Sequence, residues 1–174
     1  MKFYTMTVQW ILGRNGLFQF KFLPWHDSAY SPFLKLKKNQ MEQNKAVILC
    51  VDDEIVILNS LKKQLKKAFG ETYNYEMAES ADEALEILEE LQLDETNILL
   101  IVSDWLMPGM KGDELLIQVH QKYGHIITIM LTGQADDDAI KRAKEQANLY
   151  CCLHKPLNTK QLIETIQSGL ASHG

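Results

Sequence analysis

This 174-residue chain has few cysteines, no long apolar run and no glycine-rich phosphate loop. Its three cysteines, Cys50, Cys151 and Cys152, are too few and too poorly spaced for a disulfide framework, so we expect a reducing, cytoplasmic compartment. No run of about 18 apolar residues is present, and the sequence therefore predicts no membrane-spanning helix. No glycine-rich phosphate loop ending in Lys-Ser or Lys-Thr follows the first apolar segment, which argues against P-loop nucleotide hydrolysis.

The overall composition is that of a globular protein, but the charge is unevenly distributed. Hydrophobic residues make up 46% and charged residues 24%, which excludes disorder over the whole length. The net charge of -5 argues against direct nucleic-acid binding. The first 40 residues hold six basic residues and one acid, whereas the remaining residues hold 12 basic and 22 acidic ones. This break predicts a domain boundary near residue 44.

Residues 1–44 form a basic, aromatic extension that we place outside the working domain. Nine of the fifteen aromatic residues lie in the first 40 positions, with no sustained period of 2 or 3.6. No small-x-small cleavage site follows the partly apolar start, so a secretory signal is not predicted. Three interpretations stay open: an arm for a membrane surface or an acidic partner, a poorly ordered extension, and an over-extended reading frame ahead of Met41.

From residue 45 to residue 172 the sequence alternates between short apolar runs and amphipathic segments of helical period. The apolar runs are typical of strands buried on both faces, and Ser80 with Glu83 forms a capping box ahead of the second helix. Five strands alternating with five helices predict an α/β fold, a parallel sheet doubly wound by helices on both faces. The expected strands are Ala46–Val51, Tyr73–Ala78, Ile98–Ser103, Ile126–Leu131 and Leu149–Leu153. Four expected helices begin near Ile55, Ala81, Ala135 and Thr159, and another follows the Met107-Pro108-Gly109 turn and runs through Leu115, Leu116 and Val119.

Chemically active residues follow the strands at their carboxyl ends, where such sheets bind ligands. Asp52 and Asp53 follow the first strand, Asp104 the third, Thr132 the fourth and Lys155 the fifth. Three neighbouring carboxylates repel one another unless a cation lies among them, and Mg²⁺ prefers such oxygen ligands. Aspartate can also act as a nucleophile that forms an aspartyl-phosphate, and Asp104, alone at its strand end, is the best candidate.

These residues lie in four motifs that together resemble the receiver domain of two-component response regulators, including the stand-alone chemotaxis type. The resemblance covers residues 45–170 and implies the flavodoxin-like strand order 2-1-3-4-5. The matching motifs are Val51-Asp52-Asp53-Glu54, Ser103-Asp104-Trp105-Leu106-Met107-Pro108-Gly109-Met110-Lys111-Gly112, Leu131-Thr132-Gly133 and Lys155-Pro156.

The resemblance implies a role for each site residue. Asp104 is the expected phospho-acceptor, and Thr132 and Lys155 are expected to bind phosphoryl oxygens. Mg²⁺ is expected to be held by Asp52, Asp53, Asp104 and the backbone carbonyl of Leu106. The Lys155–Pro156 peptide bond is expected to be cis.

The resemblance also implies a signalling switch that is not a turnover enzyme. The expected donor is a phosphohistidine on a sensor histidine kinase or a histidine phosphotransfer protein. The expected output is a shift of the face formed by the last two helices and the strand between them, read by a partner protein or by a second copy. Because the chain ends at Gly174, we expect no appended output domain unless it is a fragment of a longer regulator.

Two alternatives from other classes remain open. One is an interaction module that keeps the fold without being phosphorylated, and the presence of all five site residues weighs against it. The other is a phosphatase that forms an aspartyl-phosphate on small molecules. Such enzymes commonly carry a second acid two residues after the nucleophile, where this chain has Leu106.

Two positions depart from the family pattern. Members often carry an aromatic residue three positions before the lysine, but Cys152 is found there, with Tyr150 two residues earlier on what we expect to be the same strand face. Leu106 has no polar group that could orient a water molecule, and Gln134 is the remaining candidate for that task. We therefore expect slow self-dephosphorylation.

Overall fold

The computed structural model describes residues 7–12, 18–23, 45–133 and 137–172, and the chain divides into two compact units, residues 1–41 and 42–174. In the first unit, β1 (Thr7–Leu12) pairs antiparallel with β2 (Phe18–Leu23). The sequence has no sustained period of 2 or 3.6 in this region, and these two strands were not among the predicted elements. The alternation Phe-Gln-Phe-Lys-Phe in β2 is a period-2 strand signal, and it is only a few residues long.

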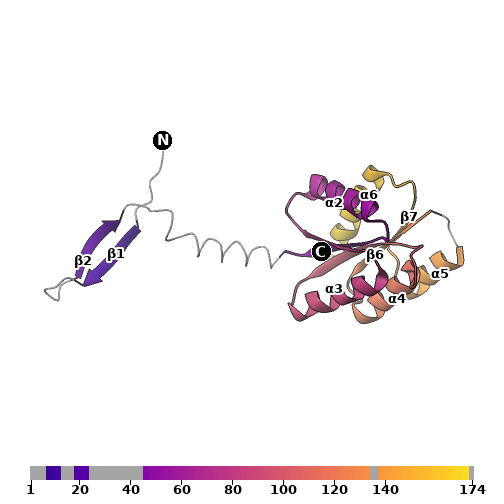
Figure 1. Ribbon diagram of the computed structural model, residues 1–174, viewed down its shortest axis with the longest axis horizontal. Coiled ribbons are helices and arrows are strands. Elements are labelled where there is room, and N and C mark those ends of the chain that lie inside the picture. The colour runs from indigo at the N-terminus through magenta and orange to yellow at the C-terminus, as the bar shows by residue number, and fades with distance from the viewer. Residues whose placement is uncertain (1–6, 13–17, 24–44, 134–136, 173–174) are drawn as a thin grey trace. The chain divides into compact units, whose positions relative to one another are not determined.

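The second unit is a five-stranded parallel sheet with helices on both faces (Figure 1). The strand order is β4-β3-β5-β6-β7, which is the predicted order 2-1-3-4-5 for the strands of this unit. Its strands are β3 (Val47–Val51), β4 (Asn74–Ala78), β5 (Ile98–Asp104), β6 (Ile127–Thr132) and β7 (Cys151–His154). Its helices are α2 (Ile55–Phe69), α3 (Ala81–Leu93), α4 (Gly112–Lys122), α5 (Asp137–Gln146) and α6 (Thr159–Ser172).

Local signals in the sequence set the helix ends. The Ser80 hydroxyl accepts a hydrogen bond from the Glu83 backbone N–H at 3.1 Å, and the Glu83 carboxylate accepts one from the Glu79 N–H at 2.6 Å. The first bond satisfies a donor that a helix N-terminus leaves without an intrahelical partner, and the second fixes the Glu83 side chain to the residue ahead of the N-cap. Helix α2 ends at Gly70, whose φ of 60° lies in the left-handed region that glycine adopts readily.

The sheet separates two apolar cores. Leu58, Leu61 and Leu65 of α2 and Leu162 and Ile166 of α6 pack on one face. Apolar residues of α3, α4 and α5 pack on the other, and Figure 1 shows these three helices together below the sheet with α2 and α6 above it. Strands β3 and β6 are buried along their whole length, because helices cover both of their faces.

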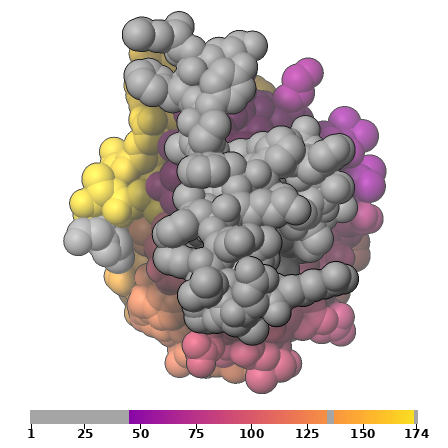
Figure 2. Space-filling model, turned by 90° about the vertical axis from the view of Figure 1, so that its left-hand side faces the viewer, coloured from indigo at the N-terminus to yellow at the C-terminus, as the bar shows by residue number. Residues whose placement is uncertain are grey.

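The two layers also show at the surface. In Figure 2 the yellow residues of α6 and the pink and orange residues of the middle of the chain lie at different edges of this unit.

Among the described residues, no helix combines the length and the hydropathy that crossing a membrane requires.

Candidate functional site

The pairing register of the sheet brings the predicted site residues to one edge. Val51 of β3 lies opposite Ser103 of β5, so the next residues, Asp52 and Asp104, are neighbours. Asp104 in turn lies opposite Leu131 of β6, and Thr132 follows Leu131 at the end of that strand. Parallel strands end at a common edge, and this is why residues so far apart in sequence meet here.

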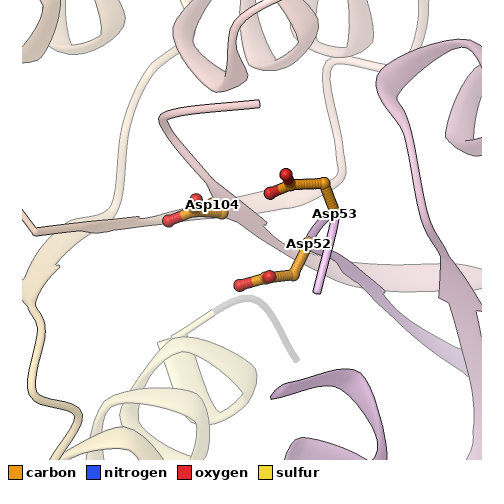
Figure 3. A group of neighbouring side chains, drawn as sticks. All are labelled: Asp52, Asp53 and Asp104. Atoms are coloured by element: carbon orange, nitrogen blue, oxygen red, sulfur yellow. The ribbon is translucent and has the colours of Figure 1, made fainter. Parts of the chain in front are cut away.

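Three carboxylates gather at this edge. Each of Asp52, Asp53 and Asp104 offers an oxygen, and these oxygens lie within 4.8 Å of one another. Figure 3 shows the carboxyl groups of Asp52 and Asp53 on the side toward Asp104. Asp52 is fully buried and Asp104 is 6% exposed, whereas Asp53 is exposed. The cluster therefore has a closed inner side and an open outer side.

Lys155 places its ammonium group between two of these acids. Its Nζ lies 2.9 Å from Oδ2 of Asp52 and 2.9 Å from Oδ1 of Asp104. The lysine is carried there by the end of β7, where its backbone N–H donates to the Thr132 carbonyl at 2.7 Å. The other oxygen of Asp52 accepts a hydrogen bond from the Glu54 N–H at 2.9 Å. Both oxygens of the fully buried carboxylate thus have a partner, as a buried charge requires.

Burial and mutual contact both shift the pKa values of Asp104 and Lys155. Burial of the charged form raises the pKa of Asp104 above its ordinary value, although the hydrogen bond and charge of Lys155 act in the opposite direction. For Lys155, burial alone would lower the pKa, but the hydrogen bonds to Asp104 and Asp52 outweigh it and raise the pKa. At neutral pH the lysine is therefore charged and holds together two carboxylates that would otherwise repel.

The remaining predicted residues lie around this cluster. Thr132 is buried at the end of β6, and Leu106, two residues after Asp104, is 62% exposed. The Lys155–Pro156 peptide bond is cis, as expected. Gln134 lies outside the described residues.

A glycine allows α4 to approach the acid-bearing strand end. A Cβ at Gly112 would overlap the backbone carbonyl oxygen of Asp104 and would lie 2.9 Å from both the Asp104 carbonyl carbon and the Trp105 Cα. Only a residue without a side chain fits this contact. The first turn of α4 is therefore docked directly on the backbone that carries Asp104.

Cys152 and Tyr150 do not share a face, which corrects the expectation from strand alternation. Cys152 packs on the core under α3, α4 and α5. Tyr150 lies ahead of β7, which begins at Cys151, and its ring contacts the position of Gly169 in α6, where an added Cβ would lie 3.3 Å from it. Alternation fails because Tyr150 is outside the strand.

One network beside the site was missed by the sequence analysis. Asp113 in α4 is fully buried and binds Trp105 and Arg142, the latter 29 residues away along the chain. In the sequence Asp113 is indistinguishable from an ordinary acid at a helix N-terminus, and no local signal marks its partner.

The fold and the acidic edge define a flavodoxin-like α/β domain whose site lies at the carboxyl ends of its strands. The model of the response regulator receiver domain matches residues 48–167, which is more than half of the chain. The chain belongs to this family of two-component signalling domains, which are switches and not turnover enzymes.

Individual relatives agree with this assignment. The hydrogenase transcriptional regulatory protein HoxA of Cupriavidus necator is 28% identical over 77% of this chain, which covers 26% of that protein. The sensor kinase CckA of Brucella abortus is 31% identical over 78% of this chain, which covers 14% of the kinase. The chain thus spans about a quarter or less of these relatives.

Solved structures show the same fold. A CheY-like receiver domain protein from Methanospirillum hungatei JF-1 is 31% identical, with a TM-score of 0.66, over 75% of this chain and 97% of that one. The signal receiver domain of an HD domain-containing protein from Pseudomonas fluorescens Pf-5 is 29% identical, with a TM-score of 0.67, over 75% and 98%.

Proposed function

We propose that residues 45–172 form a receiver domain in which Asp104 accepts a phosphoryl group from a phosphohistidine partner. The phosphorus–nitrogen bond to the donor histidine breaks as a bond forms to a carboxylate oxygen of Asp104, and the histidine nitrogen retains the electron pair. The observation that carries this proposal is the Lys155 ammonium, 2.9 Å from Asp104 and from Asp52 at an open strand edge. A cation in that place suits the charge on phosphoryl oxygens.

The donor atoms at this edge fit Mg²⁺. Three carboxylates within 4.8 Å supply the hard oxygen ligands that this ion prefers, and exposed Asp53 leaves room for retained waters. Asp52, Asp53, Asp104 and the backbone carbonyl of Leu106 would hold it. When bound, Mg²⁺ would supply positive charge that offsets the charge of the phosphoryl oxygens.

The other residues orient the incoming group. Asp104 is held by its strand and by Lys155, so the attacking oxygen is positioned before the donor arrives. Thr132 lies one residue beyond the partner of Asp104 in the sheet, and its hydroxyl is the proposed donor to a phosphoryl oxygen. Leu106 has no polar group to orient an attacking water, which supports slow self-dephosphorylation.

The surface beside the acids supports a protein donor. Ile55 and Val56, just after Asp53, are 55% and 73% exposed, and Leu106 is 62% exposed. We expect Val56→Glu to slow transfer from a phosphohistidine protein while leaving phosphorylation by acetyl phosphate unchanged. Leu93→Glu, at an 83% exposed apolar position at the end of α3, is the matched control. Equal effects of the two substitutions would contradict docking beside Val56.

The output is proposed to pass through α5, β7 and α6. Thr132 ends β6 ahead of α5, and Lys155 directly follows β7, so both proposed phosphate-binding residues are joined by backbone to this face. The reader would be a sensor-pathway protein or a second copy of this chain. We place the exchange in the cytoplasm, where thiols such as those of this chain stay reduced. Residues 1–44 lie outside the switch, which is consistent with a family match that begins at residue 48.

The deciding experiment is intact-mass analysis after incubation with Mg²⁺ and acetyl phosphate. We expect one added phosphoryl group, absent in Asp104→Asn and absent when EDTA removes the metal. Beryllofluoride binding, followed by ¹⁹F NMR, is the second probe. Folded protein that takes up neither would refute the proposal and favour an interaction module. Hydrolysis of small phosphate esters with turnover would instead indicate a phosphatase.

A further inference from the structure

A buried acid with two partners lies next to the proposed phosphorylation site. Asp113 is fully buried at the start of α4. Its Oδ1 accepts a hydrogen bond from Nε1 of Trp105 at 3.0 Å, and its Oδ2 accepts from Nε and Nη2 of Arg142 at 3.1 and 2.7 Å. A carboxylate is costly to bury without such partners. Its position is therefore tied to both of the segments that carry them.

The first of these segments lies within the site. Trp105 directly follows Asp104 and directly precedes Leu106, whose carbonyl is the proposed metal ligand. Its N–H donates to the Leu131 carbonyl at 2.8 Å and its carbonyl accepts from Gly112 at 2.9 Å. The indole bond to Asp113 is the third restraint, and it holds the side chain, which is 8% exposed. Without it, the ring would be held by packing and by the Lys111 ammonium 4.9 Å from its centroid.

The second segment belongs to the other side of the site. Arg142 lies in α5, the helix that follows Thr132. Asp113 thus joins the segment after the proposed phospho-acceptor to the helix after a proposed phosphate-binding residue. The close contact at Gly112 further restrains this arrangement, because α4 has no space to shift toward the backbone of Asp104.

We propose that Asp113 is a positioning residue for phosphoryl acceptance. Through Trp105 it holds Asp104 and the Leu106 carbonyl in the arrangement that binds Mg²⁺, and Arg142 holds Asp113 itself in place. This role rests on the proposed function of the acid site. A purely structural Asp113 would affect the unfolding temperature alone, whereas a positioning residue also changes the metal affinity of the folded protein.

The test uses the full chain and measures Mg²⁺ affinity by isothermal titration calorimetry, well below the unfolding temperature of each variant. Trp105→Phe removes the indole donor and keeps the Asp113–Arg142 pair, whereas Asp113→Asn weakens both. We expect each to weaken Mg²⁺ binding by about five- to tenfold, the effect of one hydrogen bond of ordinary net strength. The maximal rate with acetyl phosphate should largely recover at saturating Mg²⁺.

Further variants test whether the effect on Mg²⁺ affinity comes from the contact with Asp113 or from the loss of any surface charge. Arg142→Met should weaken Mg²⁺ binding, and Arg142→Lys should restore part of it, because an ammonium keeps the positive charge beside Asp113 but donates from one nitrogen instead of two. Lys122→Met is the matched control, because Lys122 ends α4, the helix that carries Asp113, and pairs with exposed Glu89 at 2.7 Å. Its Mg²⁺ affinity should equal that of the unaltered chain.

The outcomes are distinct. If Trp105→Phe and Arg142→Met fold and bind Mg²⁺ as tightly as the unaltered chain, the positioning role is wrong. These two variants decide the question even if Asp113→Asn does not fold. If the unaltered chain neither binds Mg²⁺ nor takes a phosphoryl group from acetyl phosphate, the proposed function itself fails. If the unaltered chain does both and the two variants bind Mg²⁺ equally tightly, the proposed function stands and Asp113 serves the fold alone.

Discussion

Replacing Gly112 by alanine tests how closely α4 is docked on the strand end that carries Asp104. The added Cβ would overlap the Asp104 carbonyl oxygen and crowd two backbone carbons at 2.9 Å. Since C···O contacts normally exceed about 3.3 Å, α4 and the end of β5 must separate by on the order of 1 Å. Overpacking of this kind costs roughly 3 kcal/mol, because the obstructing atoms are backbone and cannot rotate away. For a unit of this size, that lowers the unfolding temperature by about 10 °C.

Thermal unfolding followed by circular dichroism measures this effect, with Gly133→Ala as the matched control. Gly133 is exposed, and among the residues that the structure describes a Cβ there would meet no atom within 4 Å. Its replacement should leave the unfolding temperature unchanged or raise it slightly, because alanine restricts the unfolded chain. The Gly112 variant should also be phosphorylated more slowly by acetyl phosphate, since Asp104 is displaced. Equal unfolding temperatures for the two variants would refute the steric argument.

Three further predictions concern charge and burial. Lys155→Met should lower the free energy of unfolding by about 2 kcal/mol, because it leaves two buried carboxylates without their cation. Added Mg²⁺ should then raise the unfolding temperature of this variant more than that of the unaltered chain. An equal effect of Mg²⁺ on both would contradict this. Since the pKa of Asp104 is raised, folding favours its protonated form, and stability is lost as pH rises above about 4. Asp104→Asn should therefore unfold at a higher temperature than the unaltered chain at pH 7, with a difference that shrinks in acid; a constant difference from pH 7 to pH 3 would count against this. Burial raises the pKa of the Cys50 thiol to about 12. Iodoacetamide at pH 8 should therefore label the two half-buried cysteines of β7 and spare Cys50, which peptide mass spectrometry can measure. Labelling of all three cysteines at one rate would contradict this and show that β3 opens.

Most of the sheet unit could be predicted because its signals are local. The apolar run before Asp52 marks a buried strand, and Ser80 with Glu83 marks a helix start that the structure confirms through two hydrogen bonds. The hairpin of β1 and β2 was missed because a strand of six residues gives only three repeats of its pattern, too few against an irregular background.

The site itself could also be predicted, up to its chemistry. Alternating strands and helices require parallel strands, and parallel strands share their carboxyl edge. Asp52, Asp104 and Lys155 were therefore expected together, and the structure places them within hydrogen-bonding distance although 103 residues separate the first from the last. The sequence did not indicate that Asp52 is fully buried while Asp53 is exposed.

By itself, the sequence determined the order of the strands and helices and the residues at the carboxyl edge, because periodicity, capping and strand ends depend on near neighbours. Only the tertiary structure decided which face Tyr150 takes and that Asp113 joins Trp105 to Arg142. Those contacts depend on how α4 and α5 dock on the sheet, and docking is set by the packing of many side chains at once. The sequence alone therefore does not distinguish a buried aspartate such as Asp113 from an exposed one such as Asp53.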